Sequence, residues 1–167
     1  LSDEGSIINK IDAFPKYASR QALAKFLTKY EIFQKILHVN GSIVEAGVLH
    51  GGGTLAWAKL SSILEPTNHT RKIIGFDTFA GFPSINDKDK KGTDGSLLKI
   101  GELKGSAQKS VTEAVSIYDE NRPLNHIPKV ELVEGDIVNT APAYIKENPH
   151  LVISMLYLDV DLYQPTK

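Results

Sequence analysis

The chain has 167 residues, a formal net charge of −1, 41% hydrophobic and 23% charged side chains, and no cysteine. This balance is typical of a globular domain, lacks the basic excess of a nucleic-acid-binding protein, and excludes disulfides and thiolate metal sites. No apolar run approaches the ~18 residues of a membrane span. We therefore expect one cytoplasmic domain over residues 1–167 that binds neither nucleic acid nor membrane, and a homo-oligomer is left open.

Helical and strand patterns alternate along the chain after an N-terminal lead-in. Residues 1–15 are polar and end in Phe14-Pro15, and we expect them to be irregular. Ser19 is placed to cap a helix whose apolar residues recur at helical spacing up to Leu37. Beyond it, the patterns predict strands over 42–46, 72–76, 129–133 and 151–158 and helices over 54–64, 106–121 and 141–147.

Strands that alternate with helices predict an α/β fold, a Rossmann-like doubly wound parallel sheet with right-handed crossovers and helices on both faces. Strand 151–158 is a continuous apolar run, which predicts burial on both faces. A doubly wound sheet usually has further strands, so we expect C-terminal strands to be missing from this chain. Residues 78–105 are rich in Gly, Lys and Asp with little periodicity, which is typical of a lid or substrate loop.

A glycine turn follows the first strand, in the sequence SIVEAGVLHGGG over residues 42–53. Glu45 ends the apolar run, and Gly47, Gly51 and Gly52 follow before the helical pattern begins. Strand, glycine turn and helix bring the backbone close to a nucleotide-like ligand, because glycine takes positive φ and has no Cβ to block the ligand. The spacing differs from the GxGxxG of pyrophosphate-binding domains. This pattern favours an adenosyl cofactor without a pyrophosphate.

An acid stands at the end of every predicted strand: Glu45, Asp77, Asp136, Asp159 and Asp161. Ligands of open parallel sheets lie beyond these ends, so the acids predict one shared site. Asp77 suits ribose hydroxyls, and Asp136 suits an adenine amino group. Structural alternatives stay open, because Glu45 could cap a nearby helix or pair with a lysine, Asp77 could form a turn, and Asp136 could cap a short helix. Acids after a buried strand are harder to explain structurally, since an unpaired charge there is costly.

Four motifs resemble a known family: IVEAGVLHGGG, IIGFDTFAGFP, VELVEGDI and LYLDVDLYQPT. Over residues ~20–167 the chain resembles class I S-adenosylmethionine-dependent methyltransferases, and within them the macrocin O-methyltransferase (TylF-like) family. The resemblance implies a transferase that moves a methyl group from S-adenosyl-L-methionine to a hydroxyl of a small-molecule acceptor, a sugar or a natural product. It also implies Mg²⁺ or another divalent cation.

Carried over residue by residue, the resemblance implies a role for each strand-end group. The methionine part of the cofactor would be lined by Glu45, Gly47, Gly51 and Gly52, the ribose would bind Asp77, and the adenine would lie near Asp136. Asp159 would be a metal ligand and Asp161 the general base. The family's other metal ligands are a pair of acids after the next strand. We therefore expect an incomplete metal site within these residues.

The Asp159-Val160-Asp161 sequence leaves two other enzyme classes open. A nucleotide-sugar glycosyltransferase would use this DxD to hold a metal on the diphosphate. A haloacid-dehalogenase-type phosphatase would use the first Asp as nucleophile, but there the motif opens the domain, whereas here it comes last. A fragment that binds cofactor weakly or not at all also remains. Trp57 is expected in the core, and Phe79 is expected either over the adenine or packed under the loop.

Overall fold

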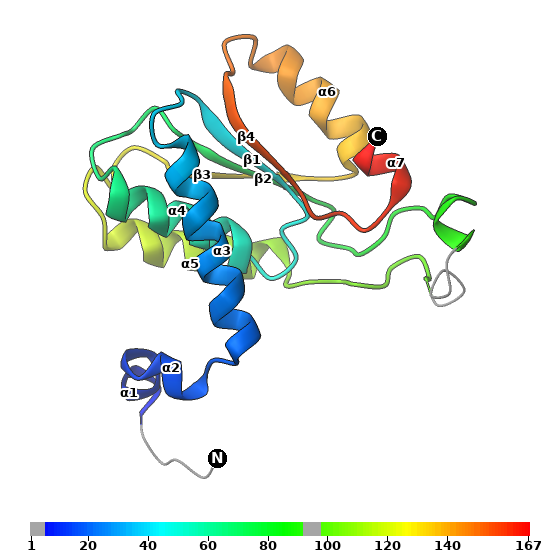
Figure 1. Cartoon of the computed structure of the whole chain (residues 1–167). Helices are drawn as coiled ribbons and strands as arrows, with labels where there is room; N and C mark the ends of the chain where they lie inside the picture. Colours follow the sequence, from blue (N-terminus) through cyan, green and yellow to red (C-terminus); the bar gives the residue numbers. More distant parts are fainter. Residues whose placement is uncertain (1–5, 92–97) are drawn as a thin grey trace. The chain divides into compact units, whose positions relative to one another are not determined.

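The computed structural model describes residues 6–91 and 98–167, so residues 1–5 of the expected lead-in and 92–97 of the 78–105 loop lie outside the described residues (Figure 1). The chain divides into two compact units, Leu1–Lys35 and Ile36–Lys167. The strands are β1 (Ser42–Ala46), β2 (Ile73–Asp77), β3 (Val130–Glu134) and β4 (Ile153–Leu158). The helices are α1 (Ile7–Asp12), α2 (Phe14–Tyr17), α3 (Arg20–Ile36), α4 (Gly52–Leu64), α5 (Gln108–Glu120), α6 (Ile137–Glu147) and α7 (Tyr163–Thr166), with a 3₁₀ turn η1 (Asp89–Lys91).

The N-terminal unit is helical, and the prediction of an irregular lead-in is wrong for the residues of α1 and α2. The Ser6 hydroxyl accepts the Asn9 N–H at 3.3 Å and so caps α1. Pro15 lies in the first turn of α2, where its missing N–H leaves no hydrogen bond unmade. The cap predicted for α3 is confirmed, because the Ser19 hydroxyl accepts the Ala22 N–H at 3.1 Å.

A four-stranded parallel sheet in the order β3-β2-β1-β4 forms the centre of the second unit. Helices α4 and α5 cover one face and α6 covers the other (Figure 1). This arrangement confirms the predicted α/β fold with helices on both faces. No helix within residues 6–91 and 98–167 is both long and apolar enough to cross a bilayer.

Each face of the sheet has its own apolar core. On the α6 side, Tyr144 packs with Val44, Ile74 and Phe76, and the Phe76 and Tyr144 rings meet edge to face at 5.5 Å. On the α4 side, Trp57 is fully buried, which confirms the core prediction. The alternation of strand side chains between the two faces explains how five-residue strands supply both cores.

Strand β4 corrects the prediction of a strand buried on both faces. It pairs with β1 only, at the edge of the described sheet, and Leu156 and Leu158 are 56% and 42% exposed. An apolar groove of about 570 Å³ runs along β4, α6 and α7. The apolar run correctly indicates a strand of a parallel sheet. It carries no information on which strand lies at the edge, and for this reason the predicted burial of β4 is too high.

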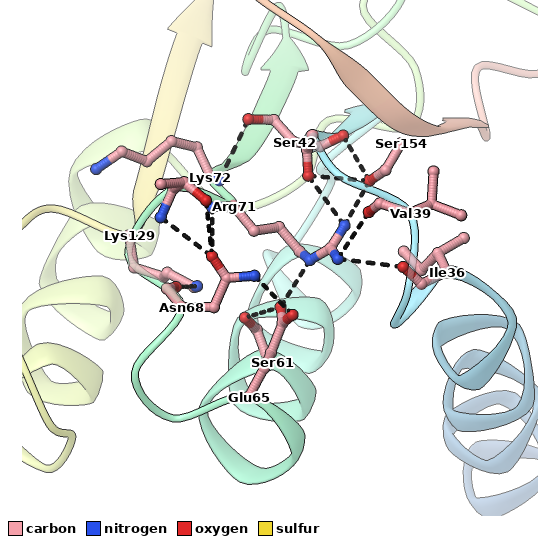
Figure 2. Close-up of polar contacts among 12 residues, drawn as sticks. Ile36, Val39, Ser42, Ser61, Glu65, Asn68, Arg71, Lys72, Lys129 and Ser154 are labelled. Carbon is pink, nitrogen blue, oxygen red and sulfur yellow. Dashed lines mark hydrogen bonds and ion pairs between the residues drawn. The ribbon is translucent and has the colours of Figure 1, made fainter.

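The amino ends of the strands are held together by one buried arginine (Figure 2). The Arg71 guanidinium donates to Glu65 Oε1 at 2.6 Å and to Ser154 Oγ at 2.6 Å. Its other bonds go to the backbone carbonyls of Gly41, Ile36 and Val39, at 2.9, 3.1 and 3.0 Å. All five N–H donors of the guanidinium group are therefore used in hydrogen bonds. Within the second unit, Arg71 therefore links Ile36 and Val39 to the starts of β1 and β4.

The charged partner of Arg71 is itself well satisfied. Burial acts to raise the pKa of Glu65, but hydrogen bonds from Ser61, Arg71 and Asn68 outweigh it and hold that pKa below the usual 4.5. The same region contains Lys129, which is 4% exposed and donates to the Asn68 carbonyl at 2.6 Å. A buried cation near an arginine and other lysines makes this end of the sheet sensitive to pH.

We expect the free energy of unfolding to rise between pH 8 and pH 9.5 because of Lys129. Burial lowers its pKa from 10.5 to about 8; Glu65 opposes this shift, and the nearby cations add to it. In this window the unfolded state binds more protons than the folded state, so stability increases with pH. Urea unfolding should show a gain on the order of 1–2 kcal/mol.

Lys129→Met should flatten this slope, whereas Lys109→Met, at an exposed position of α5, should leave it intact. The measurement stops at pH 9.5 because burial raises the pKa of Tyr118, which gives the opposite dependence above pH 10. Equal slopes in the native protein and the Lys129→Met variant would show that Lys129 is not the titrating group.

Candidate functional site

The acids predicted to share a site do follow strand ends at one edge of the sheet. Parallel pairing brings all four carboxyl ends to this edge, in the order β3, β2, β1 and β4. Three backbone hydrogen bonds of 2.9 Å extend the ladder just past the strands, from the N–H of Gly135 to the carbonyl of Asp77, from Gly47 to Phe76, and from Asp159 to Ala46. Neighbouring ends are therefore one strand spacing apart, about 4.8 Å.

Asp77 is fixed by backbone donors at the centre of this edge. Its Oδ2 accepts the N–H groups of Val48 and Leu49 at 2.7 and 2.8 Å, and its Oδ1 accepts the Phe79 N–H at 2.7 Å. The carboxylate thus ties the glycine turn after β1 to the end of β2. Because a carboxylate can accept about four hydrogen bonds, Asp77 keeps capacity for a ligand hydroxyl.

Glu45 is buried beneath the glycine turn, with only 2% of its surface exposed. Its Oε2 accepts a short hydrogen bond from the Thr54 hydroxyl, and its Oε1 accepts the Trp57 indole N–H at 3.3 Å. Both donors lie on α4, so Glu45 fixes this helix to β1.

Two glycines of the turn have positive φ and pack against protein atoms. A Cβ on Gly47, at φ +94°, would lie 2.1 Å from the Asp159 carbonyl oxygen. A Cβ on Gly51, at φ +79°, would lie 2.7 Å from a Val111 methyl group. At the next position, Gly52, no described atom lies within 4 Å of such a Cβ. Gly47 and Gly51 therefore have a structural reason for lacking a side chain, beside any contact with a ligand.

Asp136 is the N-cap of α6. Its Oδ1 accepts the Val138 N–H at 3.0 Å, and the helix begins at Ile137, four residues before the predicted helix over 141–147. The cap satisfies an otherwise unpaired donor of the first turn, which explains the earlier start. Of the two roles that the sequence left open for Asp136, the cap is therefore present in the structure.

Asp159 and Asp161 lie in the segment between β4 and α7. Asp161 has φ +51°, an unfavourable conformation for a residue other than glycine. The Leu162 N–H donates to the Val160 carbonyl at 2.5 Å, which makes the turn tight. Among the described residues, no three His, Cys, Asp or Glu side chains are grouped to hold a metal ion. Asp159 and Asp161 thus offer two carboxylates of an incomplete donor set.

A small hollow of about 80 Å³ lies at this edge and joins three of the predicted residues, Gly47, Asp77 and Asp136. Of the described residues, its lining does not include Glu45, Gly51, Gly52, Asp159 or Asp161. The remaining walls come from the ends of β2 and β3, from the 78–105 loop and from the segment after β4: Phe76, Thr78, Pro83, Gly135, Ile137, Val160, Leu162 and Pro165.

Sequence reasoning missed Leu162, which is 4% exposed and lines the hollow. Its only signal was an apolar residue beside two acids. Phe79, for which two positions were considered, packs with Val48 and Val111 and lies in a core cluster. The hollow is well below the ~300 Å³ of a typical ligand pocket, so a bound adenosyl group would require Leu162 or the loop to move.

Solved methyltransferase structures share this fold. The crystal structure of CalS11, calicheamicin methyltransferase, is 32% identical with a TM-score of 0.91, over 99% of this chain and 64% of that chain. The apo structure of CalS11, described as a TDP-rhamnose 3′-O-methyltransferase in calicheamicin biosynthesis, is 28% identical with a TM-score of 0.80, over 99% and 63%. The O-methyltransferase NovP, at 19% identity and a TM-score of 0.62 over 85% and 55%, supports the fold alone.

The sheet, its helices and these likenesses define a Rossmann-like α/β domain of the methyltransferase class. The chain belongs to the macrocin-O-methyltransferase (TylF) family, whose model matches residues 21–167. A comparison with curated protein sequences gives no match. The chain spans about 64% of the length of the CalS11 crystal structure that it matches.

Proposed function

We propose that the protein is an S-adenosyl-L-methionine-dependent O-methyltransferase that methylates a hydroxyl of a small sugar or natural-product acceptor. The observation that carries this proposal is the hollow lined by Gly47, Asp77 and Asp136 at the carboxyl ends of three adjacent strands. Membership of the family and the likeness to CalS11, a TDP-rhamnose 3′-O-methyltransferase, support the reaction class and a sugar as acceptor.

The donor and acceptor groups at this edge fit an adenosyl cofactor. Asp77 is an acceptor already oriented by backbone N–H groups, so it is suited to a hydroxyl of a ribose. Asp136 uses Oδ1 for the cap of α6, which leaves Oδ2 to accept from an adenine amino group. In this proposal Gly47, Gly51 and Gly52 border the methionine part of the cofactor. Glu45 also borders it, and its bond from Thr54 fixes α4 to β1.

Bound S-adenosylmethionine would supply a methyl group on a sulfonium. Asp161 would accept the proton of the acceptor hydroxyl while the oxygen of that hydroxyl gains the methyl group. The cofactor would leave as an uncharged thioether. General-base assistance of this kind is worth about 10²–10⁴-fold in rate. The 78–105 loop is proposed as a lid or substrate loop, since Thr78 and Pro83 line the hollow and the Ser106 N–H, just past the loop, bonds the Leu49 carbonyl at 3.1 Å.

The proposal also includes a bound Mg²⁺ ion that assists the reaction, with Asp159 as one of its ligands. The described residues do not supply a full oxygen donor set. Mg²⁺ prefers octahedral oxygen coordination and keeps several waters. We propose that the remaining acidic ligands of the metal come from strands that continue the sheet beyond β4. Such strands would also cover the exposed apolar side chains of β4.

We expect titration calorimetry of the whole protein to show saturable binding of S-adenosylmethionine in the absence of any UDP-sugar. Methyl transfer to sugar acceptors should fall on treatment with EDTA and return with Mg²⁺. Binding of the UDP-sugar in place of S-adenosylmethionine would favour the glycosyltransferase alternative. Methyl transfer that EDTA leaves unchanged would overturn the magnesium role and leave the methyltransferase assignment intact.

A further inference from the structure

The 78–105 loop contacts the segment after β4 through two neighbouring side chains. Lys88 Nζ donates to the Tyr163 hydroxyl at 2.8 Å and lies 4.0 Å from the centre of its ring. Asp89 Oδ1 accepts the backbone N–H of Tyr163 at 2.7 Å. Lys88, Asp89 and Tyr163 are called the clasp below. It joins residues 74 and 75 positions apart in the chain.

Asp89 is held in place by its own loop. Its Oδ2 accepts the Asn86 N–H at 2.7 Å, and its backbone N–H donates to the Asn86 carbonyl at 3.0 Å. The two carboxylate oxygens thus have separate tasks, one within the loop and one across to Tyr163. This division distinguishes Asp89 from Asp87, whose side chain is 92% exposed and pairs at 3.0 Å with Lys90, also exposed.

The clasp anchors one side of the turn that carries the proposed metal ligand and base. One anchor is the hydrogen bond from the Asp159 N–H to the Ala46 carbonyl, at 2.9 Å. Another is the clasp bond from the Tyr163 N–H to Asp89, and Asp161 lies between them at φ +51°. A non-glycine residue in this region costs about 1 kcal/mol or more and persists only where its surroundings fix it.

The two segments that the clasp joins also line the same hollow. Thr78 and Pro83 come from the loop, and Leu162, the neighbour of Tyr163, is buried at its wall. The clasp therefore sets how the loop and the turn lie against each other at the edge where the acids gather. The hydrogen bonds of the clasp are exposed and contribute only modestly to overall stability, so what the clasp determines is local geometry.

We propose that Lys88 and Asp89 are positioning residues that hold Asp161 in its reactive orientation through Tyr163. This inference rests on the proposed function, in which Asp161 takes the proton of the acceptor hydroxyl. Neither residue needs to touch the substrate. A displacement of about 1 Å at a reacting group can lower the rate about 100-fold, so loss of the clasp should act on turnover.

The test compares Asp89→Ala with Asp87→Ala, and Lys88→Met with Lys90→Met, in the whole protein. We expect Asp89→Ala to lower kcat by about 10- to 100-fold with little change in the Kd of S-adenosylmethionine, and Asp87→Ala to behave as the native protein. Lys88→Met should show a smaller fall than Asp89→Ala. Asp89→Asn keeps a carbonyl acceptor and should recover part of kcat.

Amide hydrogen exchange gives a readout that is independent of activity. The hydrogen-exchange rate of the Tyr163 amide should be higher in Asp89→Ala than in the native protein. In Asp87→Ala the rate should be the same as in the native protein. Equal kcat in Asp89→Ala and Asp87→Ala, in an active protein, would overturn the clasp alone. A fall in S-adenosylmethionine affinity as large as the fall in kcat would also overturn it, since it would mean a general loss of structure. A native protein without any methyl transfer would overturn the proposed function and this inference with it.

Discussion

Replacing Asp77 by alanine is expected to weaken the binding of S-adenosylmethionine by about 10- to 100-fold. A ribose hydroxyl bonded to a carboxylate contributes about 1.5–3 kcal/mol, and every 1.4 kcal/mol is tenfold in affinity. The variant also frees the N–H groups of Val48 and Leu49, which the carboxylate now holds at 2.7 and 2.8 Å. Both effects act at the same place, and titration calorimetry measures their sum.

The matched control is Glu134→Ala, which removes an exposed acid from the end of β3 outside the lining of the hollow. This control should bind the cofactor as the native protein does. Circular dichroism melting curves check that Asp77→Ala is folded at the temperature of the titration. If it is not, Asp77→Asn keeps one acceptor oxygen and the size of the side chain, and should still weaken binding at least tenfold. Native affinity in a folded Asp77 variant would rule out the ribose role.

The sheet could be predicted from sequence because its signals are local. The five residues of β1 stand between Asn40-Gly41 and the glycine turn, so both ends of the strand are marked. The acids at the strand ends were predicted to converge, and parallel pairing brings two of the five, Asp77 and Asp136, to one hollow together with Gly47. Parallel strands share one direction, so residues that end successive strands must meet at one edge.

Other features depend on contacts that no local pattern reveals. Asp136 fitted both a ligand acceptor and a helix cap, and only the start of α6 at Ile137 shows the cap. The exposure of β4 follows from its place at the edge, which strand order decides and sequence order does not. Arg71 stands in a polar stretch between two predicted elements and has the sequence appearance of a surface residue. Its partners are 30 to 83 positions away, apart from Glu65 and Asn68.

Arg71→Met should lower the free energy of unfolding by about 3–5 kcal/mol, the largest stability effect that we expect from a single substitution here. Methionine replaces the aliphatic part of the arginine side chain but has no guanidinium group and donates no hydrogen bond. It would remove the hydrogen bonds that Arg71 now donates to the Gly41, Ile36 and Val39 carbonyls and to Glu65 Oε1. Breaking one partner of a buried ion pair costs more than the pair itself contributes, because the remaining charge stays desolvated.

Urea unfolding followed by circular dichroism measures this loss, with Arg20→Met as the matched control at an exposed arginine. The control should change stability by no more than about 0.5 kcal/mol. Arg71→Lys keeps the positive charge but replaces the planar guanidinium group by a single ammonium group. It should therefore recover only part of the lost free energy of unfolding. Full stability in Arg71→Lys would mean that charge alone matters at this position. The order native, Arg71→Lys, Arg71→Met is expected because each step removes donors from the same carbonyls, those of Ile36, Val39 and Gly41 before β1.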